Sequence, residues 1–259
     1  MSEKNQRLKR FFAEHPNCCF CGGERTATTE DHQPGRIFFR NREWPEGFSF
    51  PACFECNQVS RASERILGVL IHGHGADEDR SEYQKNLRSV SREFPDEILQ
   101  LITSSREKRD ILKAKGLPRP YGLSLNDVPI IKMRKEFWEP HFGMLARKLL
   151  LAFHYQCFSQ PLSRTGGFWY YIHTNVDFAA KEYPADVLEM ANRLATPARN
   201  KRFLNDQFLI RWNVAEDGPA AVFLAQLQKM LVITGFTTED TERFADIEGD
   251  EPLRPFGPW

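Results

Sequence analysis

Apolar residues in the second half of the chain follow two different periods. Between residues 136 and 158 they recur every three or four positions, at Leu145, Leu149 and Phe153, which predicts a buried helix. Farther along, runs of aromatic and β-branched residues are bounded by turn-forming residues, which is typical of strands. The predicted strands are residues 168–174, residues 208–214 and one stretch within residues 221–234, with residues 216–219 as the turn between the last two.

The pattern in the middle of the chain predicts polar helices. The apolar residues of 63–70 extend a helix that we expect to begin near Asn57, and residues 78–116 carry a thin apolar stripe among many charges. Residues 115–122, rich in glycine and proline, are the clearest linker. We therefore predict three segments: a module over residues 1–62, a helical connector and linker over residues 63–120, and a mixed α+β domain over residues 121–259.

Four of the six cysteines form two Cys-x2-Cys knuckles, at Cys18 and Cys21 and at Cys53 and Cys56. Each knuckle turns two sulfurs toward one point, so the two together supply the four thiolates of a structural zinc site. Cys19 competes with Cys18 for the first knuckle, but only Cys18 has the required spacing to Cys21. We therefore expect Zn²⁺ to be held by Cys18, Cys21, Cys53 and Cys56.

Three residues near the knuckles are surplus to such a zinc site. Asp31 and His32 lie between the knuckles, and Asn57 directly follows the last cysteine. His32, with an ordinary pKa of about 6.5, is suited to take a proton from an attacking water. The oxygens of Asp31 and Asn57 suit Mg²⁺ or Mn²⁺, which stabilises the charge that develops when a phosphodiester is hydrolysed. This set predicts a nuclease that leaves 5′-phosphate and 3′-hydroxyl ends.

Two points about these three residues stay open. Neighbouring residues of a regular strand point to opposite faces, so Asp31 and His32 share a site only if the strand is distorted or ends there, as Pro34 suggests. Asn57 also fits a helix cap, and a cap is compatible with metal binding.

The combined motif resembles a known family of nucleases. It reads Cys18-x2-Cys21, Asp31-His32-x-Pro34, Cys53-x2-Cys56-Asn57. It resembles the zinc-bearing HNH, or ββα-metal, endonucleases, and most of all the phage recombination endonuclease VII type, over about the first 62 residues. The resemblance implies an α+β protein with an N-terminal zinc-stapled, treble-clef-like ββα finger, the histidine on its first strand and the asparagine at the start of its helix.

One position departs from the pattern of this family. Many members carry a second asparagine that orients the catalytic imidazole, and this chain has Phe48 there. Asn41, Ser49 or a backbone carbonyl are the candidates to hold the ring of His32 instead.

The charged residues are unevenly distributed along the chain, although their sum is zero. The chain has 35 basic and 35 acidic residues, and a net charge of zero argues by itself against a nucleic-acid partner. Basic residues nevertheless crowd the first ten positions, whereas seven acids lie within residues 237–259. Arginines beside a phosphodiesterase centre are suited to hold the backbone of DNA, or of another nucleic acid. The candidates are Arg36, Arg40, Arg42 and Arg61.

No apolar run approaches the 18 or so residues that a membrane span requires, and the first residues lack an apolar signal segment. We therefore expect a cytoplasmic protein without a membrane partner. The second half has no assigned role: it selects the substrate, forms a homo-oligomer or senses a signal. Two other functions remain: a zinc-stabilised nucleic-acid-binding module without catalysis, which Phe48 supports, and a protein-interaction adaptor, which the zero net charge supports.

Overall fold

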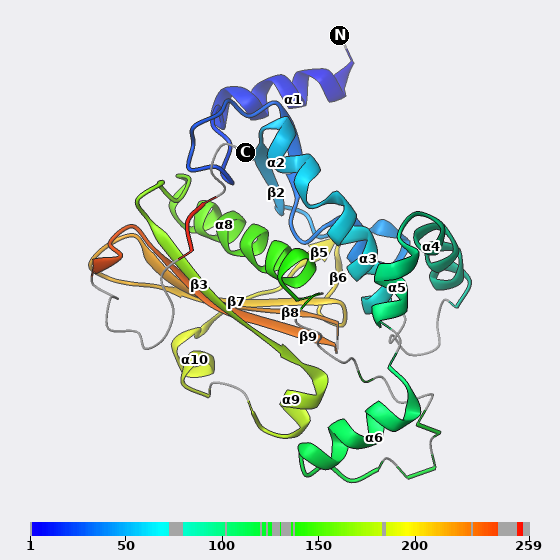
Figure 1. Cartoon of the computed structure of the whole chain (residues 1–259). Helices are drawn as coiled ribbons and strands as arrows, with labels where there is room; N and C mark the ends of the chain where they lie inside the picture. The colour runs from blue at the N-terminus through cyan, green and yellow to red at the C-terminus, as the bar shows by residue number, and fades with distance from the viewer. Residues whose placement is uncertain are drawn as a thin grey trace.

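The computed structural model describes residues 2–72, 80–101, 103–119, 121–122, 124–125, 130, 136, 138–182, 185–228, 230–242 and 253–255. It is a mixed α+β structure, as predicted. An antiparallel sheet lies below the long helix α8, and the short helices α9 and α10 lie on the other side of the sheet (Figure 1). The N-terminal elements α1, β1, β2, α2 and α3 sit beside α8. Among the described residues, no helix combines the length and hydrophobicity that a bilayer crossing requires.

The main sheet has the strand order β3-β9-β8-β7-β4. Its strands are β3 (Gly167–Thr174), β4 (Arg193–Ala195), β7 (Phe208–Val214), β8 (Ala220–Leu227) and β9 (Leu231–Thr238). The strand predicted within residues 221–234 is present as β8, but the prediction missed β9, because the chain reverses at Gln228, which has a φ of 50°. The stretch thus contributes to two neighbouring strands. The turn predicted at 216–219 joins β7 to β8.

Helix α8 (Met144–Phe158) confirms the predicted buried helix and follows a π-helical turn, η3 (Trp138–Gly143). It is apolar around most of its circumference, so it packs on the sheet and on the N-terminal elements at once. Gly235 of β9 permits a close approach. A Cβ atom there would lie 2.7 Å from a methyl carbon of Leu150 and 2.4 Å from the backbone oxygen of Trp169.

The N-terminal half supplies most of the other helices. They are α1 (Glu3–Glu14), α2 (Phe54–Val59), α3 (Arg61–His72), α4 (Arg80–Glu93), α5 (Pro95–Leu101) and α6 (Ser105–Ala114). The helix expected to run from Asn57 through residue 70 is interrupted at Ser60, which separates α2 from α3. The polar helices expected over residues 78–116 are present as α4, α5 and α6. Helices α9 (Asn175–Ala179) and α10 (Ala185–Met190) follow β3.

Two short strands form the N-terminal hairpin, β1 (Thr29–His32) and β2 (Ser49–Ala52). They pair antiparallel, with His32 opposite Ser49. The segment between them contains two short 3-10 turns, η1 (Arg36–Phe38) and η2 (Arg40–Arg42). We call β1, β2, the segment between them, α2 and the two cysteine knuckles the finger. A second small hairpin, β5 (Ala198–Arg199) with β6 (Arg202–Phe203), lies between β4 and β7 in the chain.

One hydrophobic core cluster joins the finger, the connector helices and the sheet. Phe48, which stands where the family pattern has an asparagine, belongs to this core. Its ring makes edge contacts with Phe153 of α8 at a centroid distance of 6.5 Å and with Phe208 of β7 at 5.4 Å. The residue therefore fastens the finger to the sheet. Of the acidic segment 237–259, residues 243–252 and 256–259 lie outside the described residues.

Candidate metal centre and active site

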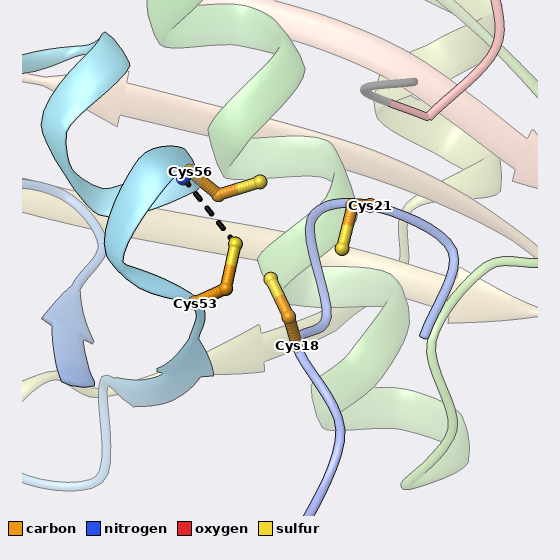
Figure 2. A group of neighbouring side chains, drawn as sticks. All are labelled: Cys18, Cys21, Cys53 and Cys56. Atoms are coloured by element: carbon orange, nitrogen blue, oxygen red, sulfur yellow. Dashed lines mark hydrogen bonds between the residues drawn. The ribbon is translucent and has the colours of Figure 1, made fainter. Parts of the chain in front are cut away.

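The four predicted zinc ligands converge in the structure. The sulfurs of Cys18, Cys21, Cys53 and Cys56 all lie within 4.8 Å of one another, and all four residues are buried (Figure 2). A tetrahedral ion with Zn–S bonds of about 2.3 Å requires sulfurs about 3.8 Å apart, so the cluster fits zinc. Backbone N–H groups support the sulfurs: Cys56 donates to Cys53 Sγ and Phe20 donates to Cys18 Sγ, each at 3.4 Å.

The electrostatics of the cluster also favour a bound cation. Hydrogen bonds with Cys18 and Cys56 lower the pKa of Cys21 to about 4, whereas contacts with Cys18 and Cys21 raise the pKa of Cys56. One thiol therefore ionises at the expense of its neighbour. A divalent cation removes this competition and lets all four sulfurs bind as thiolates. Cys19 is fully buried, and burial raises its pKa well above the ordinary value, in agreement with its exclusion from the ligand set.

A cleft of about 550 Å³ opens beside the finger. Asp31, His32 and Asn57 all line it, so the structure brings the three predicted catalytic residues to one place. Strand β1 ends at His32, as the position of Pro34 predicted. Asn57 lies within α2, whose N-cap is Cys53, so the alternative in which Asn57 caps the helix is wrong.

The imidazole of His32 is held on both sides. Its Nδ1 lies 2.9 Å from the hydroxyl of Ser49, one of the candidates for that task, and its Nε2 accepts from the Arg36 guanidinium. Because arginine only donates, Nε2 is unprotonated and Nδ1 carries the hydrogen. Burial first, and then the charge of Arg36, lower the pKa of His32 to about 4. The ring is thus neutral, with its lone pair on Nε2.

Asp31 faces the protein interior and pairs with a buried lysine from α8. The ammonium of Lys148 contacts Asp31 Oδ2, the backbone oxygen of Cys56 at 2.9 Å and the hydroxyl of Ser60 at 3.1 Å. It also lies 4.4 Å from the centre of the Phe20 ring. Burial lowers the pKa of Lys148, but the Asp31 and Glu64 carboxylates outweigh burial and raise it above the ordinary value. Lys148 therefore stays charged.

A second carboxylate, on Glu64 of α3, enters the same cleft. Burial and the negative charge of Asp31 raise its pKa to about 7. Ser60 donates to its Oε1 at 2.7 Å, and the fully buried Gln33 approaches Asp31 Oδ1 with its amide nitrogen at 3.4 Å. The amide oxygen of Gln33 has no hydrogen-bond partner among the described residues. Oxygen donors therefore gather at the inner wall of the cleft.

The predicted phosphate-binding arginines divide into two groups. Arg36, Arg42 and Arg61 line the cleft. Arg40 is turned away, because its guanidinium pairs with Asp206 and its backbone N–H donates to Gln207 Oε1 at 2.7 Å. Arg40 therefore connects the finger segment to the sheet. Arg65 also lines the cleft and pairs with Glu93 at 2.5 Å.

Comparisons of the chain with protein-family models, with curated proteins and with solved structures found no match. The geometry of the site therefore carries the functional argument.

Sequence reasoning missed Glu64, Lys148 and Trp44 as residues of the site. Glu64 follows Asn57 by seven positions. In the continuous helix that the sequence predicted, this spacing puts both residues on one face, so it was a usable signal. Lys148 follows Arg147 within a mostly apolar helix, and a charged residue that is buried there requires a partner. The ring of Trp44 lies 4.5 Å from that of His32, and no spacing in the sequence links the two.

Proposed function

We propose that this protein is a metal-dependent endonuclease that hydrolyses phosphodiester bonds of nucleic acid, most simply DNA, in the cleft beside the finger. The observation that carries the proposal is the meeting of His32, Asp31 and Asn57 in one cleft lined by arginines. A structural zinc site needs none of these residues, and neither does a scaffold.

His32 is the general base in this proposal. A neutral imidazole with a free-base Nε2 is the form that accepts a proton from water, and Ser49 fixes the ring through Nδ1. Arg36 covers Nε2 in the absence of substrate. A phosphate group attracts the guanidinium more strongly than a neutral imidazole does, so substrate binding would draw Arg36 onto the phosphate and free Nε2 for the attacking water.

Asp31, Asn57 and Glu64 are the residues that would hold Mg²⁺ or Mn²⁺, and such an ion supplies charge stabilisation to the phosphate when bound. The oxygen donors of these side chains suit a hard cation. Lys148 holds Oδ2 of Asp31, which leaves Oδ1 on the side of Gln33. The ion pair thereby fixes the orientation of the Asp31 carboxylate.

A specific observation also favours a second function, a nucleic-acid-binding module without catalysis. Lys148 neutralises Asp31 and Arg36 covers the base, so the two groups needed for hydrolysis are both engaged. In that case the cleft would bind a phosphate backbone and leave it intact. The adaptor alternative has no comparable support in the cleft.

The test is cleavage of supercoiled plasmid by the purified chain with Mg²⁺, Mn²⁺ or EDTA. We expect relaxed or linear products with a divalent ion, none with EDTA, and a loss of at least 10²-fold in His32→Ala. His173→Ala, which removes a histidine of β3 outside the cleft, is the matched control and should cleave normally. A His32→Ala variant that keeps full activity would refute the role of His32. Binding without cleavage in every metal would favour the second function.

A further inference from the structure

The small hairpin β5–β6 is attached to the finger by three hydrogen bonds. Glu46 N–H donates to the oxygen of Ala198 at 2.9 Å, and Asn200 N–H donates to Glu46 Oε1 at 3.1 Å. The guanidinium of Arg199 donates to the backbone oxygen of Trp44 at 3.3 Å. These contacts join positions about 150 residues apart in the chain. They bring a hairpin from the C-terminal half to the side of the cleft.

The contact places positive charge next to the catalytic histidine. Two guanidinium carbons lie over the ring of Trp44, that of Arg36 at 3.9 Å and that of Arg199 at 4.0 Å from its centroid. Burial lowers the pKa of Arg36. The charge of Glu30 opposes this shift, and the like charges of Arg199, Arg42 and Arg7 add to it. In the part of the chain that the structure describes, Arg36, Arg42 and Arg199 have no ion-pair partner. Such a cluster favours an incoming anion.

The hairpin also carries exposed charged and aromatic residues at and after its turn. Lys201 and Arg202 are exposed, and Phe203 leaves 65 % of its surface in solvent. Asn200 and Lys201 both have positive φ, 48° and 65°, so the turn is of the kind in which glycine is the unstrained choice. The chain has a lysine at its tip instead. Cations with an interleaved exposed aromatic ring are typical of nucleic-acid-binding surfaces.

We propose that the β5–β6 hairpin is a nucleic-acid-binding ribbon that holds the duplex beside the cleft. Lys201 and Arg202 contact phosphates, Phe203 contacts the exposed faces of sugars or bases, and Arg199 extends the charged surface to Arg36. A two-stranded ribbon has the width to enter a groove of the duplex. The inference extends the proposed function, since it assigns part of substrate binding to the C-terminal half, and it requires nucleic acid as the partner but not cleavage.

The experiment compares two charge-matched variants of the full chain by fluorescence anisotropy on a 30-base-pair duplex. Lys201→Gly/Arg202→Gln removes two charges from the hairpin, and the glycine relieves the turn. Arg109→Gln/Lys113→Gln removes two exposed charges from α6, which lies apart from the finger and the sheet (Figure 1). Zinc content and thermal melting of both variants should equal those of the parent chain. Phe203→Ser is a third variant, which tests the aromatic contact without changing the charge.

The hairpin variant should bind more weakly and with a smaller salt dependence. Affinity scales as about the −0.9 power of salt concentration for each phosphate contact, so each lost contact costs about eightfold at 0.1 M salt. The slope of log affinity against log salt should fall by about one for each contact, and the α6 variant should show neither change.

Equal affinities and equal slopes for the two variants would overturn the proposal. So would a hairpin effect seen only on anionic lipid vesicles of phosphatidylserine and phosphatidylcholine and not on the duplex. Plasmid cleavage is scored separately with the same variants. If the hairpin variant loses duplex binding and the parent chain never cleaves plasmid, the ribbon is supported and the nuclease is refuted. If the parent chain cleaves plasmid and the hairpin variant binds and cleaves as well as the parent, the nuclease is supported and the ribbon is refuted.

Discussion

The buried ion pair between Lys148 and Asp31 makes a strong prediction about stability. Replacing Lys148 with methionine keeps most of the length and volume of the side chain but removes the ammonium. Three oxygen atoms then lose their donor: Asp31 Oδ2, the backbone oxygen of Cys56 and the hydroxyl of Ser60. The carboxylate of Asp31, only 6 % exposed, is left buried without its cation.

Breaking one side of a buried ion pair typically costs about 3–5 kcal/mol of unfolding free energy. Native proteins have about 5–15 kcal/mol in total, so this loss is a large fraction. With an m value of about 3 kcal/mol per M, the urea midpoint should fall by about 1–1.7 M. Unfolding is followed by circular dichroism in excess zinc, so that loss of metal does not add to the effect.

Two further variants separate the charge effect from a packing effect. Lys113→Met changes an exposed lysine of α6 and should leave the midpoint unchanged. Asp31→Asn/Lys148→Met removes both charges and should lose much less than the sum of the two single variants, because no unpaired ion stays buried. A Lys148→Met protein within about 0.5 kcal/mol of Lys113→Met would refute the ion pair as a stabilising contact.

Zinc analysis should find about one zinc per chain. Cys53→Ser or Cys56→Ser should lose the metal and unfold the finger, since structural zinc contributes on the order of 10 kcal/mol to the folding free energy of such modules. A folded, zinc-free preparation would contradict the site. NMR titration should show His32 neutral down to about pH 4. Arg36→Gln should raise this pKa by removing a repelling charge, but not to the ordinary value of about 6.5, because burial, the larger cause, remains. An unchanged pKa in this variant would exclude the contact. Folding raises the pKa of Glu64 from 4.5 to about 7, so the folded state holds the extra proton between these values, and stability should fall as pH rises through this window. Glu64→Gln should remove that part of the pH dependence, measured by urea unfolding at several pH values.

The elements that depend on short-range spacing could be predicted from the sequence. The two knuckles, with Cys18 preferred over Cys19, could be predicted from the spacing of the four cysteines along the chain. Helix α8 could be predicted from its repeat of apolar residues. The reversal between β8 and β9 could not be found in the same way. Gln228 adopts a positive φ without being glycine, asparagine or aspartate, so the turn carries none of the usual signals.

The residues that complete the cleft depend on contacts between distant parts of the chain. Lys148 reaches Asp31 across 117 positions, and Arg199 reaches Trp44 across 155. Periodicity reports which face of an element is buried, but not which other element covers it. The predicted role of Arg40 shows the same gap, because its partner Asp206 belongs to a segment that local patterns could not associate with the finger.

The aromatic contacts of Phe48 determine which fragments of this chain are suitable for protein engineering. The finger has the size of a portable module, yet Phe38, Phe39 and Phe48 are buried in the core that it shares with α8 and the sheet. A fragment that ends at residue 62 would present these rings to water and is expected to self-associate even with its zinc in place. A chimera should therefore transplant the finger together with α8. This helix supplies the apolar surface that covers the rings, and it carries Lys148, the partner of Asp31.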